Sequence, residues 1–168
     1  KAYDGYNCIV VENAEKALQD IARFYRKKLN LTVIGITGSV GKTTTKEMVA
    51  SVLRQELNLY TAQGNFNSEI GMPMSLMSAG AHHRAAVLEM GMSARGEISR
   101  MSQTARPTVA MITNVGSSHL EYLGTRENIA AAKLEVADGL RTGGYLLLNA
   151  DEPLLAGQKT SGRHTVYI

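Results

Sequence analysis

The most constraining feature of the sequence is a β-rich run, residues 31–37, that leads through a glycine-rich loop into a helix-forming segment. The run LTVIGIT is apolar or β-branched at nearly every position, which is typical of a strand buried on both faces of a parallel sheet. The loop reads GSVGKTTT and places Lys42, Thr43 and Thr44 where the helix should begin. A strand, a loop of this kind and a helix in succession indicate a phosphate-binding loop.

The loop can bind phosphate mainly through its backbone. Gly38 and Gly41 permit positive φ angles, so successive N–H groups can point at one anion beside the helix N-terminus. We expect Lys42 to reach the β- and γ-phosphates and Thr43 to offer its hydroxyl to Mg²⁺. The strict GxxxxGK[ST] pattern is not met, because Ile36 occupies the position of its first glycine. A glycine-rich turn with a surface lysine is the alternative interpretation.

Strand and helix patterns alternate along the rest of the chain. Strands are predicted at residues 31–37, 59–62, 85–90, 108–113, 145–149 and 163–168, with a further strand end at 8–11. Helices are predicted at 13–28, 42–57 and 125–140, after a polar loop at 63–68, after Gly96, and briefly before the last strand. On the first two helices we expect Ile21, Val52 and Leu57 to face inward. The alternation predicts an α/β fold with a mostly parallel sheet and helices on both faces.

Composition excludes several classes of protein. The 168 residues suit one domain, and with 44% hydrophobic residues most of the chain can form a core rather than remain disordered. A net charge of +3, with no basic run longer than Arg26-Lys27-Lys28, argues against nucleic acid as a partner. The single cysteine, Cys8, cannot form an internal disulfide. No apolar stretch reaches membrane-spanning length, so we expect a cytoplasmic protein without membrane insertion. We also expect a monomer.

Two side chains follow predicted strands at the edge of the sheet where ligands bind in such folds. The carboxyl ends of parallel strands meet at one edge, and Glu89 ends the strand at 85–90. Glu89 can therefore hold the magnesium of a nucleotide, unless it simply emerges into solvent. His119 follows the strand at 108–113 and the loop that begins at Asn114. A histidine on the surface of a loop is the alternative for His119.

Lys133 is notable because of helical periodicity. Ile129, Val136 and Leu140 define the apolar side of the helix at 125–140, and at about 100° per residue Lys133 falls within the same stripe. A lysine that points at a sheet is costly to bury. It can extend outward to solvent, pair with a carboxylate, or have altered chemistry, such as capture of CO₂ by the neutral amine to form a carbamate.

Several motifs together resemble the Mur ligases. In chain order they are TGSVGKTTT from Thr37, GNFNSEIGMP from Gly64, LEMG from Leu88, TNVG from Thr113, HLE from His119, IAAAKLE from Ile129 and LNAD from Leu148. The resemblance covers residues 31 to about 153. The GNFNSEIGMP element is similar to that of the member that adds D-alanyl-D-alanine, with Ser68 in place of a second asparagine.

The resemblance implies ATP-dependent formation of an amide bond. The substrates would be UDP-N-acetylmuramoyl-tripeptide, whose carboxylate takes the γ-phosphoryl group, and D-alanyl-D-alanine, whose amine attacks the acyl phosphate. It implies two Mg²⁺ ions, the first bound by Thr43 and Glu89 and the second by His119 and a carbamylated Lys133. Lys42, His119 and Lys133 would be catalytic. The residues assigned to ATP are Gly38, Ser39, Val40, Gly41, Lys42, Thr43, Thr44 and Asn114.

The resemblance also implies a division into domains. Residues 1–30 would be a remnant of an amino-terminal substrate domain and its connecting helix, and residues 31–168 a truncated ATP-binding central domain. The carboxy-terminal domain would be absent, and the chain opens on Lys1 rather than methionine, as an excised piece would. We expect such a piece to bind nucleotide weakly and not to ligate.

Other functions remain open from the sequence alone. A sibling ligase, of the folylpolyglutamate or cyanophycin synthetase type, would share most of these motifs but not the GNFNSEIGMP element. A nucleotide-binding switch is a rival from another class, although the DxxG and NKxD segments expected of a GTPase are missing. A kinase would explain the phosphate loop but not Lys133.

Overall fold

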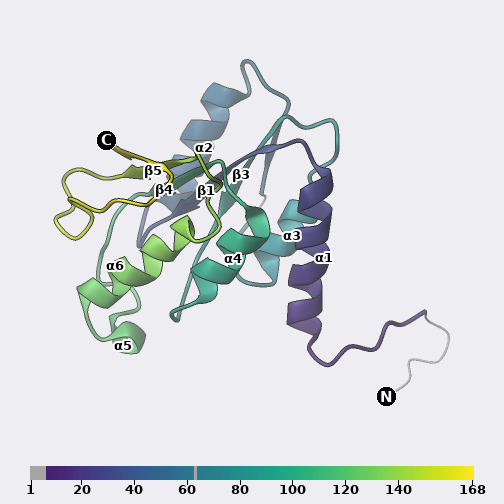
Figure 1. The fold of residues 1–168 in the computed structure, drawn as a ribbon, viewed down its shortest axis with the longest axis horizontal. Helices are drawn as coiled ribbons and strands as arrows, with labels where there is room; N and C mark the ends of the chain where they lie inside the picture. The colour runs from purple at the N-terminus through teal and green to yellow at the C-terminus, as the bar shows by residue number, and fades with distance from the viewer. Residues whose placement is uncertain (1–6, 63) are drawn as a thin grey trace.

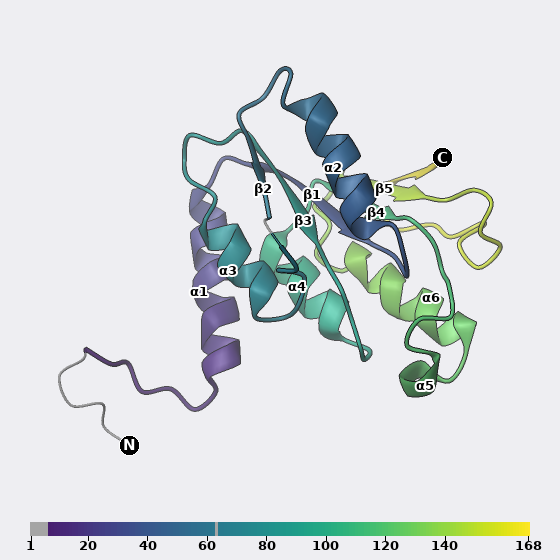
Figure 2. The same ribbon diagram turned by 180° about the vertical axis from the view of Figure 1, so that it is seen from behind.

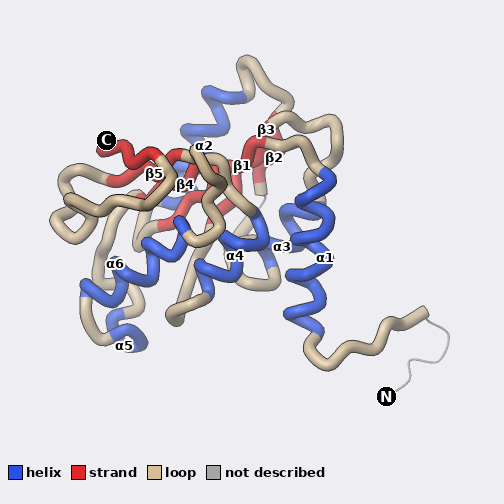
Figure 3. Tube along the Cα trace, in the orientation of Figure 1, coloured by secondary structure: helices blue, strands red, loops and turns tan. Residues whose placement is uncertain are grey.

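Six strands form one sheet in the order β2-β3-β1-β4-β5-β6, and all five neighbouring pairs are parallel (Figures 1 and 3). The computed structural model describes residues 7–62 and 64–168. The strands are β1 Thr32–Thr37, β2 Leu59–Thr61, β3 Ala85–Glu89, β4 Val109–Ile112, β5 Tyr145–Leu148 and β6 His164–Tyr167. This arrangement confirms the predicted α/β fold with a parallel sheet.

Helices cover the two faces of the sheet unequally (Figures 1 and 2). The larger core lies beneath α1 (Ala14–Lys28), α3 (Gly71–Met77), α4 (Glu97–Ala105) and α6 (Arg126–Leu134). On the other face, α2 (Lys42–Leu53) covers β1 and β3 through Val49 and Leu53. A short helix, α5 (Leu120–Leu123), and a 3-10 turn, η1 (Glu135–Ala137), complete the described elements. No described helix combines the length and hydrophobicity that a bilayer crossing requires.

Several predicted boundaries are wrong. Helix α2 ends at Leu53 rather than Leu57, and the predicted helix at 125–140 tightens into η1 after Leu134. The strand end at residues 8–11 does not form, and turns replace the helix expected before β6. The predicted polar loop begins at Gln63, which lies outside the described residues. Short segments of this kind have weak periodicity, so their ends are set by packing that the sequence pattern does not contain.

The buried faces of two helices also differ from the prediction. On α1, Ile21 is 56% exposed whereas Arg26 is buried. On α2, Val52 is 69% exposed and the buried positions are Lys46 and Ala50. Arg26 and Lys46 can be buried because each donates hydrogen bonds to backbone carbonyls inside the protein. A charged residue in the sequence therefore does not always identify an exposed helix position.

Candidate functional site

The loop between β1 and α2 has the positive glycine φ angles that the sequence predicts for it. Gly38 and Gly41 have φ angles of 155° and 81°, in the region that favours glycine. A Cβ on Gly38 would lie 1.9 Å from Thr113 Oγ1, so any side chain there would collide with the end of β4. Lys42 is the first residue of α2 and donates to the Gly38 carbonyl over 2.8 Å. The loop is therefore tightly folded, with the lysine curled back across it.

Residues after β4 hold this loop in place. Asn114 Oδ1 accepts hydrogen bonds of 3.0 Å each from the backbone N–H groups of Ser39 and Val40. Thr113 Oγ1 donates to the Val40 carbonyl over 2.7 Å, and Ser39 Oγ accepts from the backbone of Gly116 over 2.8 Å. Asn114, expected to contact the nucleotide, thus supports the loop, and two of the loop amides point at Asn114.

Thr43 and Glu89 lie together, as the sequence predicts. Glu89 is 3% exposed at the end of β3, so it does not simply emerge into solvent. Thr43 Oγ1 donates to Glu89 Oε2 over 3.2 Å, and Glu89 Oε1 lies 3.2 Å from Lys46 Nζ. Glu89 Oε1 accepts no hydrogen bond from any described residue.

This oxygen pair fits Mg²⁺. Mg²⁺ prefers hard oxygen ligands and takes only one or two from the protein when phosphates and water supply the rest. The hydroxyl of Thr43 and the carboxylate of Glu89 are such ligands, and Oε1 has spare accepting capacity. No cluster of three or more His, Cys, Asp or Glu suited to a metal occurs among residues 7–62 and 64–168.

One pocket of about 230 Å³ brings the three predicted catalytic side chains together. Lys42, His119 and Lys133 come from three different elements and all line it. His119 is exposed, has a φ angle of 67°, and immediately precedes the unpredicted helix α5. The other lining residues are Gly38, Asn67, Ser68, Gly91, Met92, Ser93 and Glu97. Ser68 also accepts a 3.1 Å hydrogen bond from the Gly71 backbone N–H at the start of α3.

Lys133 is the unusual member of this pocket. It is 2% exposed, which excludes extension into solvent, and its amine forms no ion pair with any described carboxylate. Burial and, to a smaller extent, the positive charge of Lys42 lower the pKa of Lys133 from 10.5 to about 8. Burial likewise lowers the pKa of Lys42, against the opposing effect of Glu89. Lys133 therefore carries more neutral, nucleophilic amine near neutral pH than an ordinary lysine does.

Sequence reasoning missed Lys46. This lysine is 2% exposed, donates to the Ala62 carbonyl over 2.9 Å and pairs with Glu89. The signal was present, because Lys46 precedes Val49, Ala50 and Leu53 by three, four and seven residues, which is the spacing of one helix face. Lys46 thus lies within an apolar helix stripe, as Lys133 does, and helical periodicity predicts its burial as well.

Glu135 is a second omission. Its carboxylate accepts hydrogen bonds of 2.9 Å from the Gly96 backbone N–H and 3.3 Å from that of Ser99. Glu135 therefore satisfies backbone N–H donors at the N-terminus of α4. These hydrogen bonds hold Gly96, which follows the pocket-lining residues 91–93. No sequence signal identifies this contact, because Glu135 lies 39 residues from Gly96.

Comparison with known proteins gives a consistent result. A UDP-N-acetylmuramoyl-tripeptide--D-alanyl-D-alanine ligase of Bacillus subtilis is 47% identical over 152 residues, which cover 90% of this chain and 33% of the relative. The crystal structure of the MurF ligase of Thermotoga maritima in complex with ADP matches with a TM-score of 0.91 and 34% identity, over 99% of this chain and 39% of that one. The chain thus spans about a third of the length of these ligases.

More distant proteins share only the fold. Escherichia coli FolC in complex with DHPP and ADP matches with a TM-score of 0.69 at 16% identity, over 96% of this chain and 48% of that one.

The family model of the Mur ligase middle domain matches residues 36–167, which include the phosphate loop, Glu89, His119 and Lys133. Together with the parallel sheet and the pocket at its carboxyl edge, this match shows that the chain belongs to the Mur ligase middle-domain family.

Proposed function

We propose that this chain is the ATP-binding part of a ligase that joins D-alanyl-D-alanine to UDP-N-acetylmuramoyl-tripeptide. The observation that carries the proposal is the pocket that gathers Lys42, His119 and Lys133 beside the Thr43–Glu89 pair. The ligase of Bacillus subtilis, named for these substrates, and the Thermotoga maritima structure, which holds ADP, support it. ATP and a UDP-linked substrate imply a cytoplasmic enzyme.

The reaction has two steps. An oxygen of the peptide carboxylate attacks the γ-phosphorus of ATP, the bond to the β-phosphate oxygen breaks, and ADP leaves. The amine of D-alanyl-D-alanine then attacks the acyl carbon, loses a proton, and releases inorganic phosphate as the amide forms. Phosphoryl transfer to a carboxylate brings negative charges together, so the site must supply positive charge in fixed positions.

The residues of the chain divide this work. In the proposal, the Lys42 side chain breaks its hydrogen bond to the Gly38 carbonyl and donates to the β- and γ-phosphates. Asn114 holds the loop backbone in position. Thr43 and Glu89 would hold one Mg²⁺, and His119 with Lys133 would hold a second. Magnesium bound there would neutralise phosphate and carboxylate charge during transfer.

For Lys133 we propose carbamylation. The neutral amine attacks CO₂, forms an N–C bond and loses a proton, which converts a buried cation into an anion suited to metal binding. Incubation with ¹³C-bicarbonate should give one carbamate signal in the ¹³C spectrum of the chain, absent from Lys133→Arg and retained in Lys16→Arg, which changes an exposed lysine. An unchanged spectrum for Lys133→Arg would rule out this site.

The domain assignment is part of the proposal. Residues 1–30 would belong to the connection from an amino-terminal substrate domain, and residues 31–168 to an ATP-binding domain whose reaction also needs a carboxy-terminal domain. The chain alone should therefore bind ADP and form no amide product, as a monomer. Amide product from the isolated chain would contradict this assignment.

A chimera tests the function directly. The matching third of the Bacillus subtilis ligase would be replaced by this chain, and phosphate release measured with UDP-N-acetylmuramoyl-tripeptide and ATP. We expect release to depend on D-alanyl-D-alanine and to fall at least a hundredfold with Lys42→Ala. Activity with glutamate instead would favour a sibling ligase. Hydrolysis of GTP in preference to ATP, with no need of an amine, would favour a switch.

A further inference from the structure

A second pocket lies at the opposite edge of the sheet from the phosphate loop. It has a volume of about 320 Å³ and is formed by the C-terminal end of α1, the turn between α4 and β4, and the turn before β5. Its lining residues are Arg26, Lys27, Lys28, Leu29, Asn30, Arg106 and Arg141. Five of the seven are cations, and none is a carboxylate.

Arg26 forms the floor of this pocket. It is 5% exposed and donates to the carbonyls of Ala105 (2.7 Å), Leu29 (3.1 Å) and Leu31 (2.8 Å). Arg26 therefore contributes a buried positive charge whose hydrogen-bond donors are largely used by backbone carbonyls. Burial, followed by the nearby charges of Arg141 and Arg106, lowers the pKa of Arg26 to about 10, so like charges crowd this region.

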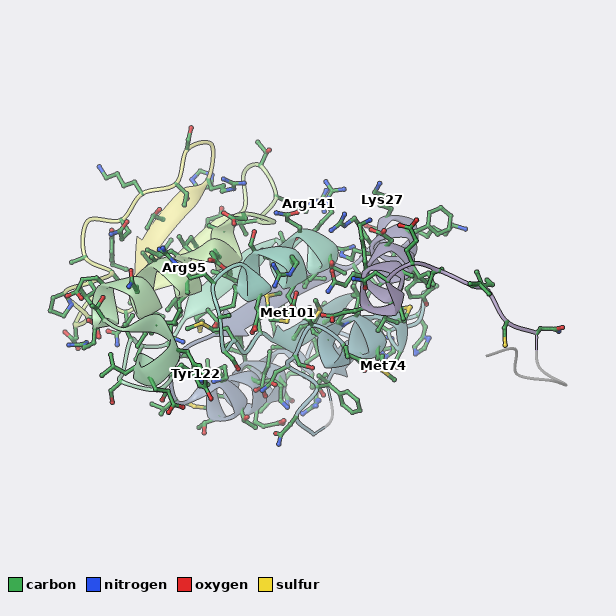
Figure 4. The ribbon with its side chains drawn as sticks, turned by 90° about the horizontal axis from the view of Figure 1, so that it is seen from below. Lys27, Met74, Arg95, Met101, Tyr122 and Arg141 are labelled. Carbon is green, nitrogen blue, oxygen red and sulfur yellow. The ribbon has the colours of Figure 1, made fainter. Side chains whose placement is uncertain are left out.

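The remaining cations have no counter-ion among residues 7–62 and 64–168. The side chains of Lys27, Arg106 and Arg141 form no hydrogen bond or ion pair with any described residue, and Lys28 lies only over the ring of Phe24. Figure 4 shows Lys27 on α1 and Arg141 on the same side of the molecule. A helix C-terminus accounts for Lys27 and Lys28 but not for cations from two other segments.

The backbone that carries the two outer arginines is held in place. Arg106 has a φ angle of 47°, and its backbone N–H donates to the Ser102 carbonyl over 2.7 Å, which closes α4. The backbone N–H of Arg141 donates to the Pro107 carbonyl over 2.9 Å. The positive charges are therefore presented around a fixed concave surface rather than on a mobile tail.

We propose that this pocket binds a small soluble anion with two linked phosphate groups. Arginine side chains donate paired hydrogen bonds to phosphate oxygens, and several converging cations suit a ligand with more than one negative charge. The volume lies at the lower end of the range of small-ligand sites, about 300–1,000 Å³, and fits a diphosphate. A lipid surface fits less well, because Leu29 is the only apolar residue among the described residues that line the pocket.

Pyrophosphate is the probe, and the backbone amides report where it binds. In an NMR titration we expect saturable shifts at Leu29, Arg106 and Arg141, separate from any shifts at Gly41 and Lys42 in the phosphate loop. Arg141→Gln should weaken binding at the second pocket about tenfold, the effect of one charge-assisted hydrogen bond. Lys159→Gln, which removes an exposed charge elsewhere, should leave it unchanged.

Three results would overturn the proposal. The first is shifts confined to the phosphate loop. The second is equal affinity in Arg141→Gln and Lys159→Gln, with unchanged phosphate-loop shifts proving that both variants are folded. The third is binding to phosphatidylglycerol vesicles without binding of pyrophosphate. Because the readout lies at the opposite edge of the sheet, the outcome is independent of the ligase proposal.

Discussion

Two buried lysines, one on each face of the sheet, have opposite surroundings. Lys46 on α2 and Lys133 on α6 are each 2% exposed. Lys46 contacts the Ala62 carbonyl, Glu89 and Glu47 at distances of 2.9, 3.2 and 3.3 Å. Lys133 has no such partner among the described residues, and its pKa falls to about 8.

The difference shows that burial alone does not identify a functional lysine. The ammonium of Lys46 lies beside a carboxylate and a carbonyl, so its contacts hold Glu89 in place. A buried ammonium that faces another lysine is unstable in its charged form, so Lys133 is held closer to the neutral amine. In the proposed ligase reaction, this cost would be retained because a neutral, reactive amine is needed at Lys133.

The largest expected effect is loss of stability on removing Lys46. Lys46→Met leaves the carboxylate of Glu89 buried without its cation, and we expect the free energy of unfolding to fall by about 4 kcal/mol. Denaturant titration measures it. The double variant Lys46→Met/Glu89→Gln should recover much of the loss, because the buried charge is gone. Equal stability of the two variants would show that Lys46 acts through packing alone.

Removing Lys133 should increase the stability of the protein, whereas removing Lys46 should decrease it. In buffer free of CO₂, Lys133→Met should raise the free energy of unfolding at pH 7 by about 3 kcal/mol, since the pKa of Lys133 drops from 10.5 to about 8 on folding. Between these values the unfolded chain binds more protons, so the stability of the unsubstituted chain rises with pH.

The gain from Lys133→Met should therefore be full below pH 8 and shrink as pH rises toward 10.5. Denaturant titrations at pH 7 and pH 10 test this. A gain that is independent of pH would mean that methionine simply packs better than lysine.

A smaller effect is expected at Asn114, which supports the phosphate loop without carrying charge. Asn114→Ala removes the acceptor for two loop N–H groups and should weaken ADP binding about fivefold, or about 1 kcal/mol. Calorimetric titration measures the affinity. Asn58→Ala is the control, because Asn58 is exposed and its side chain forms no hydrogen bond with any described residue. Equal ADP affinities of Asn114→Ala and Asn58→Ala would show that Asn114 does not support the nucleotide site.

The sequence pattern was sufficient for the central elements of the fold. The runs at 31–37 and 85–90 are apolar on both faces, and both form central parallel strands of the sheet. It was also sufficient for Lys133, because the stripe defined by Ile129 and Val136 extends over several turns. These predictions succeed where local preference and burial agree along the whole segment.

Other features depend on contacts between distant segments. Ile21 is exposed because α1 is anchored instead by Arg26, whose partners include Ala105, 79 residues away. The assignment of Asn114 to the nucleotide site stays a prediction, whereas the hydrogen bonds that its amide oxygen accepts from Ser39 and Val40 were not predicted. Pairings of this kind depend on how β1 and β4 are placed side by side, which no local pattern encodes.

Calorimetric titration of the chain with ADP, with and without Mg²⁺, is the most direct test of the nucleotide site. We expect saturable binding that is strengthened by Mg²⁺, nearly abolished by Lys42→Ala, and made insensitive to Mg²⁺ by Glu89→Gln. Lys159→Gln should bind as the unsubstituted chain does. Equal affinity in Lys42→Ala, or an undiminished effect of Mg²⁺ in Glu89→Gln, would contradict the assignment of this edge of the sheet as the nucleotide site.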